Sequence, residues 1–523
     1  MNALRISATG MPVLDSLLGG GFLSNSVVTI SHQPSVANYW ELVYRMAISN
    51  FDSDFYSILV TFRFSIEEYL NRVKFSAQND PNFAAIVENG LSGIFSVIDC
   101  FNVSEGEEDS RKGNVYYVSN PFNANNLLSV MSNVRERVPE GKHVLWIFFD
   151  LTDMNIGLPE DEVVKFCRRA FRYHKQRGDQ ALYFLNEKAQ SNTFFAKIYQ
   201  LSDVFIKLIA EETSWGLTSA VQVIKSVFPF QSKKVFYDID ENGKLQFLKN
   251  KPENKPKKPT SNNILSGKAG GEDLRLFRTG IPSFDSLLGG GMFLNSIIVG
   301  SHQYGVRILE PSLQLFRDKF GEKTHVIQVN YHYSPDEYEI RSKILRQKAE
   351  IHELPAKSFS TGKLSVIDCF NIKNNETEKD NEKSNNNIYP LSNPFNTDKL
   401  LSIMTRVRSS IPEDMSAFWI FTDLTDMSIG VSEDEVLKFC RRAFRYHKWC
   451  GDMAIYTLNE QAHTERFLAK LYQLSDVFIK FIGEDTREGI DTSIQILKSS
   501  FNFNSKKAKY LLDEKGNMQF AED

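Results

Sequence analysis

The sequence predicts an α/β protein built from two tandem copies of one domain, each with a mostly parallel sheet covered by helices. The length of 523 residues exceeds what one hydrophobic core usually supports. The motif "TGMPVLDSLLGGG", which begins at Thr9, recurs as "TGIPSFDSLLGGG" from Thr279. Short apolar, β-branched runs alternate with helix-length segments in both halves, which is typical of helix-covered parallel sheets.

The repeat sets the domain boundaries. "EDEVVKFCRRAFRYHK" from Glu160 returns as "EDEVLKFCRRAFRYHK" from Glu433, and "SVIDCFN" also occurs in both halves. The intervening segment is rich in Pro, Lys, Asn and Gly and can bury little surface, so it is interpreted as a flexible linker. We therefore expect domains at 1–249 and 274–523, joined by a linker at 250–273.

Each predicted element follows from its local pattern. Near-continuous apolar runs indicate buried strands, and "DENGK" and "DEKGN" predict a turn within an antiparallel hairpin that ends each copy. The expected strands of the first copy are 26–30, 56–62, 95–101, 143–150 and 179–186. Those of the second copy are 296–300, 324–331, 364–370, 417–423 and 452–459. Helices are expected over 160–175 and 433–448, and "NPF" predicts a turn before a helix over 127–138.

Composition excludes some classes of protein. The net charge of −4 disfavours a function dominated by binding to a nucleic-acid backbone. The five cysteines form no CxxC pair and are interpreted as small buried residues in a reducing compartment. The first residues lack the pattern of a secretory signal, and no apolar run reaches the ~18 residues of a membrane helix. We therefore expect a cytoplasmic protein.

A ligand is expected at one edge of each sheet. In parallel α/β sheets ligands bind beyond the carboxyl ends of the strands. The "SHQ" segment after the first strand of each copy falls at that edge, as do Asp150 and Asp423, which end the "FFD" and "FTD" strands.

Both copies resemble the KaiC-like branch of the RecA superfamily, a group common in archaea whose domains open with a "TG…LD…LGGG" signature. The resemblance implies two RecA-like domains with the P-loop NTPase fold and nearly covers the chain. It also implies ATP and Mg²⁺ at a Walker A loop after the first strand, a Walker B aspartate at the positions of Asp150 and Asp423, and assembly into rings or filaments.

The phosphate loop departs from that family in both copies. A Walker A loop needs glycines whose N–H groups wrap phosphate, a lysine, and a hydroxyl ligand for Mg²⁺. Asn38 and Ile308 stand at the lysine positions, and Tyr39 and Leu309 at the hydroxyl positions. The degenerate loop of the first copy comprises His32, Gln33, Pro34, Ser35, Val36, Ala37, Asn38 and Tyr39, and that of the second comprises His302, Gln303, Tyr304, Gly305, Val306, Arg307, Ile308 and Leu309.

The catalytic glutamates of the family are also replaced. Arg63 and Phe64 occupy their positions in the first copy, and His332 and Tyr333 in the second. Arginine and phenylalanine do not act as general bases at neutral pH. Glu67 and Glu68 are expected to begin the following helix instead, where acidic side chains suit the helix dipole.

Several residues have a structural and a functional interpretation. Lys225 and Lys498 remain from a basic segment that, in active relatives, faces the nucleotide of the neighbouring subunit. Asp150 and Asp423 could hold Mg²⁺ or cap the next turn, and the structural role is favoured. His32 and His302 are expected to fill the altered loop rather than to contact an anion or a partner.

The 160–175 helix has an apolar stripe on one side and a cationic cluster elsewhere on its surface. The cations are expected on a solvated or intersubunit face. The stripe comprises Val163, Phe166, Ala170 and Tyr173, and the cluster comprises Arg168, Arg169, Arg172 and Lys175.

These departures predict a non-hydrolysing KaiC-like protein, a pseudo-ATPase that acts as a regulatory or scaffold protein in signalling or assembly. No catalytic residue, metal or cofactor is expected. It would self-associate or join an active KaiC-like relative, and a monomer is the alternative. A second hypothesis is an ATP-binding protein or weak ATPase with a rearranged site, which would use Asp150 or Asp423 for Mg²⁺ and Arg307 or a neighbouring subunit's lysine for phosphate. A DNA-binding recombination mediator is the third, and the net charge disfavours it.

Overall fold

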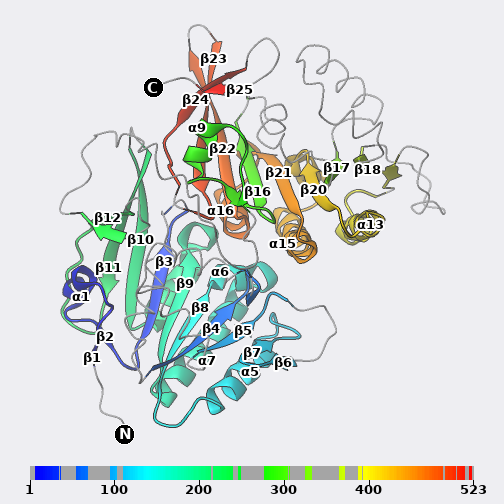
Figure 1. Ribbon diagram of the computed structural model, residues 1–523. Coiled ribbons are helices and arrows are strands. Elements are labelled where there is room, and N and C mark those ends of the chain that lie inside the picture. Colours follow the sequence, from blue (N-terminus) through cyan, green and yellow to red (C-terminus); the bar gives the residue numbers. More distant parts are fainter. Residues whose placement is uncertain are drawn as a thin grey trace. The chain divides into compact units, whose positions relative to one another are not determined.

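The chain forms two compact units, Met1–Lys257 and Lys258–Asp523 (Figure 1). The division falls within the segment expected to be a linker, which lies outside the described residues. The computed structural model describes residues 6–34, 36, 55–66, 68, 95–102, 110–213, 216–239, 245–248, 276–303, 306, 324–331, 364–370, 387–391, 393–486, 489–501, 503–512 and 518–520.

The first unit contains a large sheet with eleven described strands, in the order β13-β12-β11-β10-β3-β9-β8-β4-β5-β7-β6. The strands from β10 to β7 in this order are parallel, while β11, β12, β13 and β6 are antiparallel to their neighbours. Their bounds are β3 Val27–His32, β4 Phe55–Thr61, β5 Phe95–Asp99, β6 Ser110–Lys112, β7 Val115–Tyr117, β8 His143–Phe149, β9 Gln180–Asn186, β10 Val204–Thr213, β11 Gly216–Lys225, β12 Val235–Ile239 and β13 Leu245–Phe247. β1 Ile6–Ser7 and β2 Phe22–Leu23 form a separate pair.

The second unit repeats this arrangement with ten described strands, in the order β19-β18-β17-β20-β21-β16-β22-β23-β24-β25. Their bounds are β16 Ile297–His302, β17 Thr324–Asn330, β18 Leu364–Asp368, β19 Ile388–Pro390, β20 Ser416–Phe421, β21 Met453–Asn459, β22 Val477–Thr486, β23 Gly489–Lys498, β24 Ala508–Leu512 and β25 Met518–Phe520. β14 Leu276–Phe277 pairs with β15 Met292–Phe293. The expectation of an α/β chain with mostly parallel sheets is confirmed.

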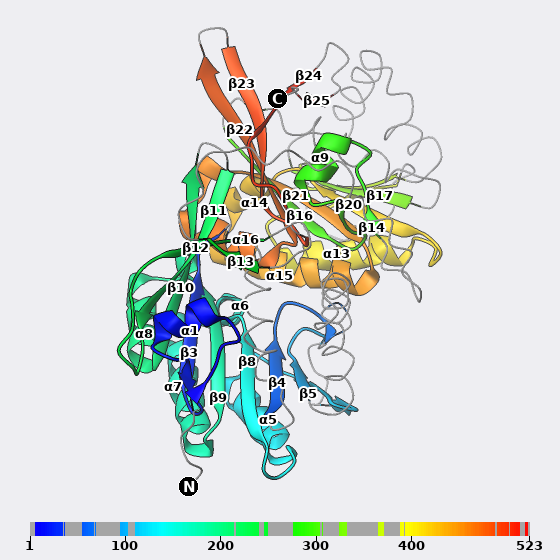
Figure 2. The ribbon, with the colours of Figure 1, turned by 60° about the vertical axis from the view of Figure 1, so that its left-hand side comes forward.

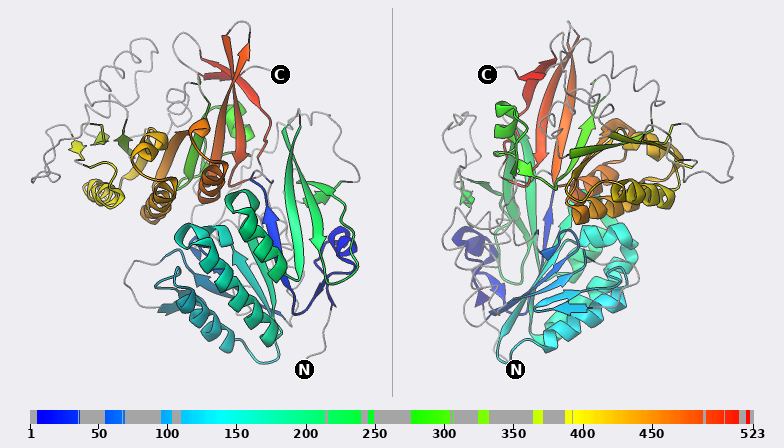
Figure 3. Two further views of the ribbon diagram at one scale, coloured as in Figure 1. Left: turned by 180° about the vertical axis from the view of Figure 1, so that it is seen from behind. Right: turned by 45° about the vertical axis from the view of Figure 1, so that its right-hand side comes forward.

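Helices cover one face of each sheet, side by side (Figure 3, left). In the first unit, apolar side chains of the three longest described helices pack on alternate residues of the strands, such as Ile58, Trp146 and Tyr183. The helices of the first unit are α1 Pro12–Leu18, α5 Ala124–Glu136, α6 Leu151–Gly157, α7 Glu160–Arg177 and α8 Asn192–Leu201, with the 3-10 turn η1 Glu187–Ala189. Those of the second unit are α9 Pro282–Leu287, α13 Thr397–Ser409, α14 Leu424–Gly430, α15 Glu433–Cys450 and α16 Glu465–Leu474, with η3 Glu460–Ala462. Within the described residues, no helix combines the length and apolarity needed to cross a membrane.

The ends of α7 and α15 follow from their sequences. Acidic residues occupy the first turn and basic residues the last, as the helix dipole favours. Each helix ends at a glycine with positive φ, Gly178 at 73° and Gly451 at 70°. The expected apolar stripe of α7 is buried at Val163, Phe166 and Ala170, while Tyr173 is only half-buried.

The largest difference from the sequence expectation is a long antiparallel pair in each unit. β10 and β11 in the first unit, and β22 and β23 in the second, each have ten residues, and they precede the expected closing hairpin. Figure 2 shows β22 and β23 projecting beyond the other strands of their sheet. The closing hairpins themselves are confirmed as β12–β13 and β24–β25, although their turns lie outside the described residues.

Candidate functional site

The carboxyl edge of the first sheet brings His32 and Asp150 together. His32 ends β3, Asp150 follows β8, and only β9 lies between these strands. The His32 Nε2 atom lies 3.0 Å from Asp150 Oδ2, and both side chains are at least 97% buried, at 1% and 3% exposure. This oxygen of the carboxylate therefore has a buried partner from the chain itself.

Asp150 also begins the next helix. Its Oδ1 accepts a hydrogen bond of 2.8 Å from the Thr152 N–H, so the aspartate is the N-cap of α6. Both carboxylate oxygens thus have partners from the chain itself. Asp150 therefore has the capping role that the sequence favours over Mg²⁺ binding.

The turn after β3 is fixed by hydrogen bonds to the sheet. The Gln33 N–H donates to the Leu208 carbonyl at 3.1 Å, and the Gln33 side-chain oxygen accepts from the Ala210 N–H of β10 at 3.2 Å. The Val36 N–H donates to the Gln33 carbonyl at 3.4 Å, and the Val36 side chain is buried in the core. Pro34 has no N–H to offer.

The N–H groups of Gln33 and Val36 are therefore bound within the fold, where a phosphate loop would direct such groups to a ligand. The remaining positions of the degenerate loop, Ser35, Ala37, Asn38 and Tyr39, lie outside the described residues.

The second unit has the same residues in a looser arrangement. Asp423 caps α14 by accepting from the Thr425 N–H at 2.7 Å, but its Oδ2 lies 3.9 Å from His302 Nε2. The His302 and Asp423 side chains are 15% and 24% exposed.

The turn after β16 is nevertheless held like its counterpart. Gln303 accepts from the Gly483 N–H of β22 at 3.2 Å and donates to Glu460 at 3.0 Å, while buried Val306 donates its N–H to the Gln303 carbonyl at 3.3 Å. Tyr304, Gly305, Arg307, Ile308 and Leu309 lie outside the described residues.

In the first copy, the positions at which the resemblance predicts catalytic glutamates hold buried side chains. Phe64 is 1% exposed and Arg63 is 6% exposed, and the Arg63 guanidinium lies 4.9 Å from the centre of the Phe64 ring. Thr61 Oγ1 accepts from the Phe64 N–H at 3.4 Å, which fixes the turn. Ser65 Oγ accepts from the Glu68 N–H at 3.1 Å, as at a helix start. Glu67, and His332 and Tyr333 of the second copy, lie outside the described residues.

Lys225 and Lys498 bind carbonyl groups at helix ends. Lys225 Nζ donates to the Tyr199 and Gln200 carbonyls at 2.9 and 3.2 Å, at the C-terminus of α8. Lys498 Nζ is buried and donates to the Tyr472, Gln473 and Ser475 carbonyls at the end of α16. In this chain both ammonium groups therefore complete a helix terminus.

Sequence reasoning missed a buried ionic group under the helices. Asp179 accepts from Arg135 Nε at 2.8 Å and from Trp146 Nε1 at 3.0 Å, and Asp452 has the same partners in Arg408 and Trp419. The acidic residue before each "ALYFLN"-type strand, together with the tryptophan in the central strand, is the signal that could have found it.

A buried histidine was also missed in each copy. His174 Nε2 lies 2.8 Å from the Tyr183 hydroxyl, and His447 Nε2 lies 2.7 Å from the Tyr456 hydroxyl. Complete burial lowers the pKa of His174 to about 3 and that of His447 to about 3, so both are neutral at pH 7.

Four of the five cysteines are buried, as the sequence predicts. Cys100, Cys167, Cys369 and Cys440 are buried free thiols, and Cys450 is half-buried. Burial raises the pKa of Cys167, which disfavours its thiolate at neutral pH. Across the described ranges, no group of three His, Cys, Asp or Glu side chains could hold a metal ion.

Comparison with known proteins adds no identification. No protein-family model matches the chain, and no curated protein matches it.

Proposed function

We propose that the chain is a non-hydrolysing pseudo-ATPase with two KaiC-like, RecA-type domains, and that it acts as a regulatory or scaffold protein. One observation carries this proposal. At the carboxyl edge of the first sheet, the chain itself binds both Asp150 carboxylate oxygens and the N–H groups of Gln33 and Val36. These are the groups that an active relative would offer to Mg²⁺ and phosphate.

The architecture supports the RecA-like interpretation. In each unit the "SHQ" segment lies at the end of one parallel strand and the Walker B-type aspartate follows another, with one strand between them, at the edge where α/β proteins bind ligands. The order of motifs along the chain and the antiparallel strands that end each unit agree with the same interpretation.

The charge balance supports the loss of nucleotide binding. A bound triphosphate needs cations and N–H donors, and each charge-assisted hydrogen bond contributes about 1.5–3 kcal/mol. The sequence has no lysine at the Walker A position of either copy, and Gln33 and Val36 use their N–H groups internally. We therefore expect millimolar or weaker affinity for ATP.

Titration of the full chain with a fluorescent ATP analogue, with and without Mg²⁺, tests this expectation. No saturation below the millimolar range is expected, and protein purified from cells should release no stoichiometric nucleotide on denaturation. Submicromolar binding, or one adenine nucleotide per domain in the extract, would contradict the proposal.

A weak ATPase in the second unit is a second candidate, because the His302–Asp423 pair there is open and partly exposed. Phosphate release by the pure protein separates the two candidates. Under our proposal the rate equals that of buffer alone. A rate that Asp423→Asn abolishes, and that the matched Asp150→Asn leaves unchanged, would establish the weak ATPase instead.

A scaffold role requires self-association or a mixed assembly with an active relative. Light scattering of the full chain, alone and with such a relative, measures this directly. A protein that stays monomeric under both conditions would argue against the scaffold role while leaving the nucleotide question untouched.

A further inference from the structure

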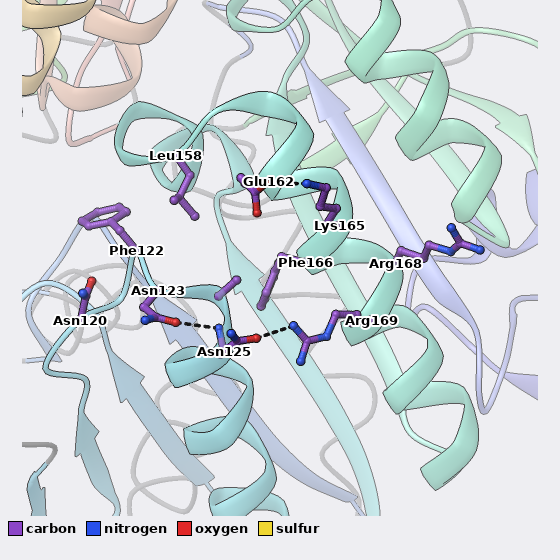
Figure 4. A pocket seen from close by; sticks show the side chains of 11 residues that line it. Asn120, Phe122, Asn123, Asn125, Leu158, Glu162, Lys165, Phe166, Arg168 and Arg169 are labelled. Carbon is purple, nitrogen blue, oxygen red and sulfur yellow. Dashed lines mark hydrogen bonds and ion pairs between the residues drawn. The ribbon is translucent and has the colours of Figure 1, made fainter.

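A cleft of about 610 Å³ opens in the first unit, between the N-terminus of α5 and the outer face of α7 (Figure 4). It belongs to the helical layer and shares no residue with the His32–Asp150 pair. Its volume falls in the range of binding pockets. The lining residues are Asn120, Phe122, Asn123, Ala124, Asn125, Leu158, Glu162, Lys165, Phe166, Arg168 and Arg169.

The charged side chains of the cleft leave a positive excess. Lys165 is paired with Glu162 at 2.7 Å, so these two charges offset each other. Arg169 donates to the neutral Asn125 amide at 2.6 Å, which leaves its charge uncompensated. Arg168 is exposed, and no hydrogen bond or ion pair joins it to another described residue. In Figure 4 the Arg168 side chain points away from the other lining side chains, so Arg169 supplies the uncompensated positive charge of the cleft.

The apolar wall is set by a close contact. The Phe122 ring packs on Gly157, where an added Cβ would lie 2.2 Å from a ring carbon. Phe395 and Gly430 make the same contact in the second unit, with 2.1 Å. The cleft therefore has a wall of Phe122 and Leu158 that the fold itself positions, with asparagine amides beside it.

The second copy keeps the arginine but neutralises it. Asp398 stands at the position of Asn125, and its carboxylate accepts from Arg442, which corresponds to Arg169. Arg442 is therefore paired with a carboxylate, whereas Arg169 is paired with an amide. The positive excess of the cleft is thus specific to the first unit.

We propose that this cleft binds an acidic peptide segment of a partner protein. Arg169 would bind a carboxylate, the Asn120 amide can both donate to and accept from a peptide backbone, and the Phe122–Leu158 wall suits one apolar side chain. The Phe122–Leu158 wall favours a peptide, which carries apolar side chains, over a bare phosphate. The inference goes beyond the proposed loss of hydrolysis, and its test measures peptide binding, so the two proposals can fail separately.

Fluorescence anisotropy of the full chain tests the proposal. The probe is a fluorescein-labelled ten-residue peptide of Asp and Glu around a central Leu-Phe pair, at 50 mM salt. We expect saturable binding that Arg169→Glu weakens at least tenfold. The matched control Arg172→Glu removes the same charge from the same helix, but Arg172 does not line the cleft, so it should change the affinity less than twofold.

Other outcomes would overturn the proposal. These are no saturable binding, an equal loss in both variants, or displacement of the peptide by inorganic phosphate or duplex DNA at matched charge. Circular dichroism checks that Arg169→Glu is folded. Arg169→Gln keeps hydrogen bonding to Asn125 and should still weaken binding at least threefold.

Discussion

The two copies close the same sheet edge to different degrees. In the first unit His32 lies 3.0 Å from Asp150 and both side chains are buried, while in the second unit the corresponding atoms of His302 and Asp423 are 3.9 Å apart and partly exposed. The glutamine that follows each histidine does not differ in this way. Gln33 and Gln303 both accept a backbone hydrogen bond of 3.2 Å from the next strand.

This difference distinguishes contacts that both units form from a contact that only one unit forms closely. The glutamine contact and the N-capping aspartate occur in both units, which indicates that they stabilise the end of the strand. The histidine–aspartate pair is formed closely in only one unit. The second unit is therefore the better place to look for any remaining ligand binding. Hydrogen exchange with mass spectrometry on the full chain measures the stability of each unit from its own peptides and so tests this comparison.

The largest loss of stability should follow removal of the buried aspartate under the helices, and it should be the same in both units. Asp179→Ala and Asp452→Ala each leave a half-buried arginine and a buried tryptophan N–H without their acceptor. We expect the free energy of unfolding of the affected unit to fall by about 3–5 kcal/mol. Asp161→Ala, at an exposed ion pair, is the control. If only one unit responds, the two scaffolds are not equivalent.

Replacing the histidine at the sheet edge should destabilise the first unit more than the second. His32→Ala leaves the buried Asp150 carboxylate without its ring partner, so the first unit should lose about 2–3 kcal/mol. His302→Ala affects a longer, partly exposed pair and should cost under about 1 kcal/mol. Equal losses in the two units would remove the distinction drawn between the sites.

Acid should again affect both units alike. The pKa of His174 and that of His447 are both about 3 in the folded chain, below the unfolded value of 6.5. Below pH 6.5 the unfolded chain binds protons that the folded chain does not, so stability falls as the pH decreases towards 3. At pH 5 each unit should lose about 2 kcal/mol relative to pH 7 from this residue. His447→Gln should flatten the pH dependence of the second unit alone, and a curve that stays unchanged would contradict this origin.

The smallest effect concerns the lysines at the helix ends. Lys498→Met removes a buried ammonium with three carbonyl partners and should cost the second unit about 1.5 kcal/mol. Lys225→Met removes a half-buried ammonium with two partners and should cost the first unit about 0.5–1 kcal/mol. A larger loss for Lys225→Met would reverse the expected order.

Much of the fold could be predicted because its signals are local. The apolar run at 143–150 predicts a strand, and β8 spans His143–Phe149. The order of strands could not be predicted, since pairing joins residues far apart in the sequence. That β9 separates β3 from β8 is one such feature, and it determines that His32 meets Asp150.

The candidate site was only partly predictable for the same reason. The sequence shows that a lysine is missing from the loop, but it does not show where the neighbouring groups find partners. Lys225 looks like part of a basic functional segment, and its ammonium instead binds the end of α8. The burial of His174 depends on the Tyr183 hydroxyl of the adjacent strand, which no periodicity within α7 reveals.

The anchored turn at Val36 also limits how this chain can evolve. Opening the turn into a phosphate-binding shape would free the Val36 N–H and withdraw its side chain from the core, at a cost of about 1.5–3 kcal/mol before any ligand contributes. Selection acts on substitutions one at a time, and each early step would weaken the protein without providing an activity. The stability that this turn contributes therefore opposes the gain of a phosphate site at this position.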